Sequence, residues 1–282
     1  IHQRYTFGIL LSVLVLFSTS CNAQAPEDSV FIHYPSNCLD FAITPDSSKD
    51  RSGLAFSDMG AWFAYGFPEE NSNYSGFSGP FLLTQENGVW ISEVLSEIEL
   101  VNIRTGEPID WTDFKVTQTS YNSHLYQVFE NQHLKVSQTL VYVSPHSAFT
   151  ITEIENRSKE SIHLSPAWKG SVFLDGIELQ QQDNCINLIS NKSNATGIIQ
   201  IFGDKINKIV VSDTAYTFKL EDFELKGGET KQLLLSHSFI FSEYSIEQEQ
   251  LDLITASGRV EELLQGRIKV KQAQLETLYD KL

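Results

Sequence analysis

Hydrophobic and polar residues alternate with a period of two along much of the chain between residues 31 and 241. The segment 133–143, for example, places Leu134, Val136 and Leu140 on one face and polar residues on the other. This alternation is typical of strands that bury one face and expose the other. The pattern therefore predicts antiparallel strands rather than helices over this part of the chain.

Similar short runs follow one another along the sequence, with Asn, Gly and Asp between them in the manner of turns. Further strands are expected at 125–129, 148–154, 197–202, 208–212, 216–220 and 231–241. No amphipathic helical pattern and no fixed-period repeat stands out between residues 25 and 240. We therefore expect a mainly β fold, a large antiparallel β-sandwich of two stacked sheets that is supersandwich-like in size.

The pattern changes after residue 243. Ser245 is a suitable N-cap for a short helix to about Ala256, since acidic residues follow in its first turn. Apolar residues at helical spacing then predict a second helix from Val260 to the end, weakened by about 1 kcal/mol at Gly266. No stop signal follows this second helix, so we expect the protein to continue past Leu282. The alternative is a terminal helix docked on the sandwich.

The first 25 residues have the features of an export signal. Arg4 precedes the apolar run 7–17, whose 11 residues are too short to span a bilayer. Small residues and then Cys21 follow, which is typical of a bacterial lipoprotein acceptor, although cleavage near Ala23 is an alternative. We expect a periplasmic or surface-anchored bacterial protein, organised as a signal (1–25), a sandwich (26–242) and linker helices (243–282).

Composition narrows the classes of partner. The 282-residue chain has 36 acidic and 20 basic residues and no run of five or more like charges, so no nucleic-acid partner is expected. Contact with a membrane is expected only through a lipid on Cys21. Cys38 and Cys185 either form a disulfide or are two separate buried thiols. His124 and His133 could face each other across a hairpin, but neither a metal site nor a cofactor is predicted.

The densest unusual stretch is 56–81, which combines Trp62 with seven Phe or Tyr residues and four glycines. Gly and Pro interrupt it, so a loop is expected rather than plain strands. Its aromatic side chains either stack on sugar rings or fill the core or a domain interface. Asp58 is a weak candidate for catalysis and is expected to accept hydrogen bonds from loop amides. Asp175, before a glycine, is expected in a turn.

The segments 56–62, Pro68, 76–80 and 82–86 resemble the N-terminal domain of bacterial family 63 glycoside hydrolases, which are α-glucosidase-like. The resemblance implies a large β-sandwich joined by linker helices to an (α/α)6 barrel, which supplies the acid and base for hydrolysis with inversion. No catalytic residue can therefore be carried over to this chain. The resemblance implies an interface or substrate-rim role for Asp58, Gly60, Trp62, Phe63, Pro68, Gly76 and Phe77. Phe63 stands where His is expected in relatives.

These observations predict the non-catalytic N-terminal β-sandwich of an exported glycoside hydrolase that acts on α-glucosidic or α-mannosidic oligosaccharides. Its partners would be an oligosaccharide and its own C-terminal catalytic barrel, and this chain alone would be inactive. The alternative is a self-standing surface lipoprotein that binds glycans without cleaving them. A third, weaker hypothesis is a complete enzyme that uses Asp58.

Overall fold

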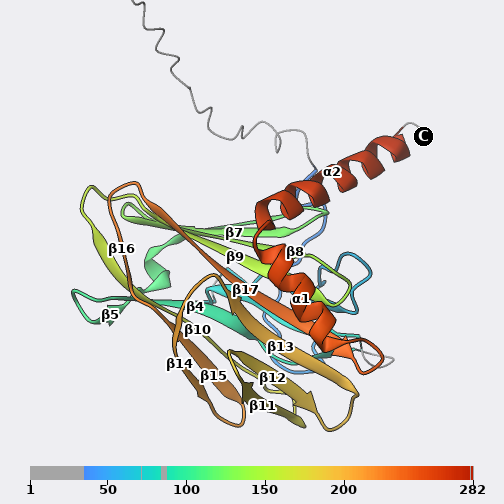
Figure 1. Ribbon diagram of the computed structural model, residues 1–282. Coiled ribbons are helices and arrows are strands. Elements are labelled where there is room, and N and C mark those ends of the chain that lie inside the picture. The colour runs from blue at the N-terminus through green and yellow to red at the C-terminus, as the bar shows by residue number, and fades with distance from the viewer. Residues whose placement is uncertain (1–34, 71, 84–87, 280, 282) are drawn as a thin grey trace, which may run out of the picture. The chain divides into compact units, whose positions relative to one another are not determined.

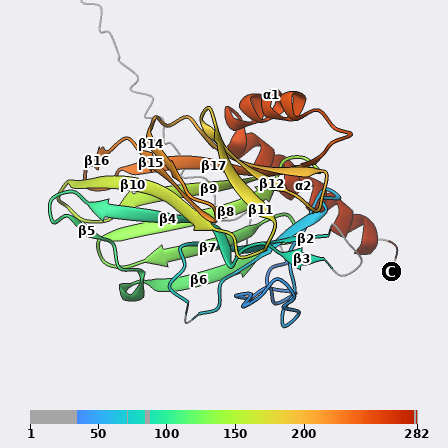
Figure 2. The ribbon, with the colours of Figure 1, turned by 90° about the horizontal axis from the view of Figure 1, so that it is seen from below.

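The computed structural model describes residues 35–70, 72–83, 88–279 and 281, which build two facing antiparallel β-sheets and two C-terminal helices (Figures 1 and 2). The mainly β fold and the sandwich expected from the sequence are confirmed. The expected export signal and Cys21 lie outside the described residues.

The first sheet contains nine strands among the described residues, in the order β1-β2-β4-β10-β15-β14, with β3, β5 and β16 attached to β2, β4 and β10. Its strands are β1 (Phe63–Gly66), β2 (Gly76–Leu82), β3 (Val89–Trp90), β4 (Val94–Asn102), β5 (Glu107–Pro108), β10 (Ile162–Ser171), β14 (Ile206–Val211), β15 (Ala215–Leu220) and β16 (Phe223–Leu225).

The second sheet contains eight strands over the same described ranges, in the order β11-β12-β13-β17-β9-β8-β7-β6. Its strands are β6 (Lys115–Ser120), β7 (Leu125–Glu130), β8 (Leu134–Tyr142), β9 (Ser147–Asn156), β11 (Ile177–Gln182), β12 (Cys185–Ser190), β13 (Ala195–Phe202) and β17 (Thr230–Phe241). All six strands predicted individually from the sequence, and the strand at 133–143, are present with ends shifted by at most about two residues.

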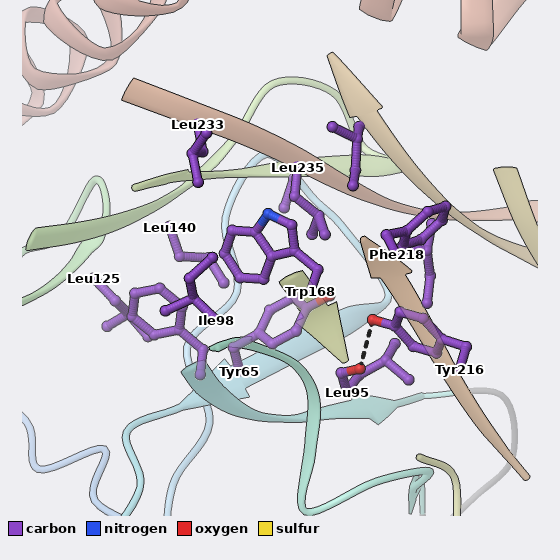
Figure 3. Close-up of a cluster of buried hydrophobic side chains, with 14 of the residues drawn as sticks. Tyr65, Leu95, Ile98, Leu125, Leu140, Trp168, Tyr216, Phe218, Leu233 and Leu235 are labelled. Carbon is purple, nitrogen blue, oxygen red and sulfur yellow. Dashed lines mark hydrogen bonds between the residues drawn. The ribbon is translucent and has the colours of Figure 1, made fainter. Parts of the chain in front are cut away.

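The main core lies between the sheets, where the inward positions of the strands meet. Leu233 and Leu235 of β17 face Trp168 of β10 and Phe218 of β15 across the sandwich (Figure 3). The Trp168 side chain is fully buried. Each such buried apolar side chain contributes about 2 kcal/mol through its removal from water.

Part of the glycine-rich stretch 56–81 forms strands, so the expected loop is wrong at 63–66 and 76–81. It contains β1 and β2, which pair with each other through an irregular register. Gly76 allows β2 to approach β4, because a Cβ there would lie 2.3 Å from the Ser96 carbonyl oxygen. Gly79 adopts a φ of +104°, which L side chains rarely adopt. Glycine thus bends these strands instead of preventing them.

Three glutamines of the opposite sheet donate hydrogen bonds to backbone carbonyls of the irregular stretch. They lie side by side on β6, β7 and β8, and two of them are fully buried. The bonds run from Gln118 Nε2 to Pro68 O at 2.8 Å, from Gln127 Nε2 to Gly76 O at 2.8 Å, and from Gln138 Nε2 to Ser75 O at 3.2 Å. Buried backbone carbonyls need such partners, so these amides hold the bent strand against the second sheet.

The two helices are α1 (Ile246–Ser257) and α2 (Val260–Tyr279). Ser245 caps α1 as predicted, since its side chain accepts a hydrogen bond from Gln248 N at 3.1 Å. Ile246 packs against a small buried cluster of Cys185, Ile198 and Ile240 beneath α1. Among the described residues, no helix is both long and apolar enough to cross a membrane.

Two predictions about cysteine and histidine are wrong. Cys38 is exposed and Cys185 is buried, and both are free thiols, so the disulfide is absent and only one thiol is buried. The register of β7 and β8 pairs Leu125 with Leu140, which puts His124 and His133 at opposite ends of the hairpin. Over the described part of the chain, no group of three or more His, Cys, Asp or Glu side chains could hold a metal ion.

Candidate functional site

A tight turn before β1 presents Asp58 to the second helix. Ala61 N donates to Asp58 O at 3.0 Å, and the two residues between them have positive φ angles, 56° at Met59 and 75° at Gly60. Two successive positive φ angles define a type I′ turn. A positive φ is uncommon for a residue with a side chain, so this conformation at Met59 is held by its surroundings.

The Asp58 carboxylate is buried and fully engaged by α2. Its Oδ2 accepts from Arg267 Nη2 at 2.5 Å and Nε at 3.2 Å, and its Oδ1 lies 2.7 Å from Lys271 Nζ. Arg267 and Lys271 are four residues apart and so share one face of the helix. The sequence analysis expected the Asp58 carboxylate to accept hydrogen bonds from amides of its own loop. The partners in the structure lie on a helix at least 209 residues further along the chain. Asp58 therefore positions α2 on the sandwich.

The other helix is attached by a carboxylate of its own. Glu249 Oε1 of α1 accepts hydrogen bonds from Ser144 Oγ at 2.5 Å and from Ser147 Oγ at 2.6 Å. Ser147 Oγ also lies 2.7 Å from Ser238 Oγ, which joins the start of β9 to β17. Charge-assisted bonds of this kind are stronger than neutral ones. Both helices are thus fixed to the sandwich by buried or half-buried carboxylates.

Replacing Asp58 with alanine is expected to lower the free energy of unfolding by about 3 kcal/mol, because two half-buried cations of α2 lose their counter-ion. Urea unfolding measures this change, and trypsin should also cut α2 faster. Asp175→Ala, which alters an exposed acid in the turn before β11, is the control and should change stability by less than about 0.5 kcal/mol. An Asp58→Ala protein as stable as this control would contradict the role assigned to the ion pairs.

The predicted aromatic residues divide between core and surface. Phe63 is fully buried, with its ring 5.1 Å from Tyr142 and 5.0 Å from Phe239, so it fills the core. Phe77 is buried too. Trp62 is half-buried and lies against the Phe241 ring with centroids 4.3 Å apart. Of the aromatic candidates, Trp62 is therefore the one with solvent access.

The other predicted residues shape the backbone. Pro68 and Gly76 are buried inside the sandwich, where their carbonyl groups receive the glutamine amides described above. Gly60 is exposed and supplies a positive φ to the Asp58 turn. The structure thus brings Asp58, Gly60 and Trp62 together on one short segment and leaves the remaining candidates in the interior.

A buried polar chain that the sequence did not reveal crosses the sandwich at His237 of β17. His237 Nδ1 lies 2.8 Å from Tyr65 Oη, and its Nε2 lies 2.6 Å from Ser96 Oγ. Ser96 Oγ also bonds to the hydroxyl of Tyr216, which donates to Leu95 O at 2.8 Å (Figure 3). The chain therefore connects β1 and β4 of one sheet, through His237, to β17 of the other.

The carbonyl at the end fixes the direction of every hydrogen bond in this chain. A carbonyl only accepts, so Tyr216 donates to it and must accept from Ser96. Ser96 then accepts from His237 Nε2–H, and the neutral ring accepts at Nδ1 from Tyr65. Burial favours the same neutral state and lowers the pKa of His237 to about 3. The imidazole is therefore a neutral structural link between the sheets.

One signal in the sequence could have pointed to His237. It occupies an inward position of β17, in period two with Leu233, Leu235 and Phe239. A polar residue in such a series must find partners inside the core. Its partners Ser96 and Tyr65 lie 141 and 172 residues away, so the sequence alone could not name them.

Solved structures of other proteins are similar to this chain in fold. A chain provisionally assigned as a kojibiose phosphorylase from the human microbiome matches with a TM-score of 0.50 and 12% identity, over 78% of this chain and 32% of that one. A chain provisionally assigned as an aldose 1-epimerase from Escherichia coli matches at 0.45 and 10%, over 66% and 98%. A heparan sulfate lyase mutant from Pedobacter heparinus matches at 0.40 and 10%, over 70% and 38%.

This chain therefore spans about a third of the length of the phosphorylase-like chain. No protein of curated function matches it in sequence. The family described as "Glucosidase YgjK, N-terminal" matches residues 40–194, which is more than half of the chain. The matched region contains the Asp58 turn, Trp62 and most strands of both sheets. The chain belongs to this family of glucosidase N-terminal domains.

Proposed function

We propose that the chain is the non-catalytic N-terminal sandwich of an exported glycoside hydrolase acting on α-glucosidic oligosaccharides. In this proposal residues 26–242 support, and residues 243–282 lead into, a C-terminal (α/α)6 catalytic barrel. The observation that carries it is the attachment of α2 to Asp58, because both carboxylate oxygens hold a helix in place. An acid or base of a glycosidase must instead be free to exchange a proton with substrate.

Exposed apolar side chains on the two helices support a further domain beside them. Leu251 and Ile254 of α1 and Val270 and Leu278 of α2 are each 45–58% exposed. The spacing within each pair, three residues on α1 and eight on α2, places both side chains on one face of their helix. Such exposed apolar faces would be covered by the neighbouring domain in this proposal. The helices would then connect two domains while remaining fixed to the sandwich.

An assay on aryl α-glucosides tests the proposal. The 282-residue chain and the product of the longer reading frame are compared at equal concentration. Turnover is expected only from the longer product, because glycoside hydrolysis needs two carboxyl groups about 5–9.5 Å apart across the bond. Robust turnover by the short chain, unchanged in Asp58→Asn, would overturn both the non-catalytic role and the hypothesis of an enzyme that uses Asp58.

The alternative function is a self-standing surface lipoprotein that binds glycans. Reading the codons after 282 separates the two: an open frame rich in Trp and acidic residues favours the hydrolase, and an immediate stop favours the binding protein. The lipid anchor is tested separately with radiolabelled palmitate. Incorporation that is lost in Cys21→Ser would support anchoring, and equal labelling of both proteins would exclude Cys21 as the acceptor.

A further inference from the structure

A cavity of about 440 Å³ lies between the two sheets, close to Trp62. One wall comes from β12, β13 and β17 and includes Leu188 and Phe239, and the facing wall comes from β2 and β3 and includes Leu82. The segment that joins β10 to β11 adds Phe173 at the rim. The volume falls in the range of about 300–1,000 Å³ typical of small-ligand sites.

The aromatic side of the cavity is held in place by the core. Trp62 packs edge-on against Phe239, with ring centroids 6.2 Å apart, and against Phe241 at 4.3 Å. Its Nε1 is buried and has no hydrogen-bond partner among the residues that the structure describes. A rigid indole of this kind binds a ligand with little loss of side-chain entropy.

The rim of the cavity carries polar groups. Ser190 Oγ accepts from Lys192 N, and Ser193 Oγ accepts from Ala195 N, both at 3.1 Å. Each hydroxyl still has a proton to donate. Lys192 Nζ lies 3.3 Å from the Asp175 carbonyl oxygen, so the ammonium bridges two sides of the rim. These donors therefore lie beside apolar side chains along the same cavity.

A glycine keeps this space open. Gly197 of β13 lines the cavity, and a Cβ at this position would lie 3.0 Å from both Leu188 Cβ and Phe239 Cε1. A larger residue would push these neighbours or project into the cavity. The backbone of β13 thus forms part of the wall directly.

We propose that this cavity, whose lining includes Lys49 and Lys192, binds a short α-linked oligosaccharide, an inference that rests on the glycosidase role proposed above. A pyranose ring has an apolar C–H face and a polar edge of hydroxyl groups. Trp62 and Phe173, which line the cavity, supply aromatic surface for the first, since aromatic rings attract the weakly positive sugar C–H groups. The polar edge of hydroxyl groups would bind the donors at the rim, which are Ser190, Ser193 and Lys192. The domain would thus hold one end of a glycan by itself.

Isothermal titration of the full chain with maltotriose and with kojibiose tests this inference. Saturable binding with a dissociation constant of about 1 mM is expected, typical of a single-site sugar contact. Phe173→Ala should weaken it about tenfold, and Phe173 is exposed enough at 36% for the fold to tolerate the change. Ser190→Trp should abolish binding by filling the cavity. Phe223→Ala, a half-buried phenylalanine on β16, is the matched control and should bind like the unaltered chain.

Circular dichroism confirms that each variant is folded. A folded chain that binds neither sugar, or a Ser190→Trp protein that binds as well as the unaltered chain, would overturn the assignment. This outcome can be told apart from failure of the glycosidase proposal, because turnover by the longer gene product does not depend on sugar binding by the isolated chain.

Discussion

Replacing His237 with alanine is expected to lower the free energy of unfolding by about 4 kcal/mol. The change removes a buried ring and leaves a cavity between the sheets. It also leaves the Tyr65 and Ser96 hydroxyls without the partner that joins them. Because both effects occur in the core, the loss should approach that of the largest single-residue substitutions.

Urea unfolding followed by fluorescence measures this loss. His163→Ala is the matched control, because the His163 side chain is about half exposed and its nearest acidic atom, Glu224 Oε1, is as far away as 3.9 Å. This substitution should lower the free energy of unfolding by less than about 0.5 kcal/mol. Tyr65→Phe should cost about 1–2 kcal/mol, because it removes only the donor to Nδ1. A loss below about 1 kcal/mol for His237→Ala would refute a structural role for the polar chain.

The sandwich should lose stability steeply between pH 6.5 and 4. Burial lowers the pKa of His237 to about 3 and that of His124 to about 4 in the folded chain. In the unfolded chain both return to about 6.5 and take up protons below that pH. The unfolded state therefore binds more protons, and stability that is complete above pH 6.5 is lost as pH falls. Each imidazole contributes up to about 1.4 kcal/mol per pH unit.

Unfolding midpoints at several pH values between 7 and 4 test this dependence. His124→Gln should remove about half of the slope. Glu97 acts in the opposite direction, because burial raises the pKa of its carboxyl and protonation in acid then favours the folded state. A slope in His124→Gln equal to that of the unaltered chain would contradict the assignment.

Local patterns predicted much of the fold. The alternation along β8 and β17 and the Ser245 cap each depend on residues close together in the sequence. These two strands and the start of α1 could therefore be predicted from the sequence. The strands β1 and β2 could not be predicted from the sequence, because the glycines at their bends interrupt the alternation of apolar and polar residues. A row of glutamines from the other sheet also binds backbone carbonyls of this stretch, and no local pattern indicates those contacts.

The candidate site was predicted less well for the same physical reason. The interpretation of 56–81 as aromatic and unusual identified Trp62 and Asp58, but the partner of Asp58 is on a helix near the other end of the chain. Phe63 and Phe77 have the same type of side chain as an aromatic residue that contacts a sugar, and only their burial shows that they do not. Such differences come from tertiary packing, which composition does not determine.

The short distance along the chain between Asp58 and Trp62 has a mechanical consequence. The turn between them is closed by its own hydrogen bond and by a second bond from Ser57 Oγ to Ala61 O at 2.9 Å. One short turn therefore joins the ion pairs of α2 to the indole that borders the cavity. A change in the position of α2 would reach Trp62 along this path, against the packing of Phe239 and Phe241 that holds the ring.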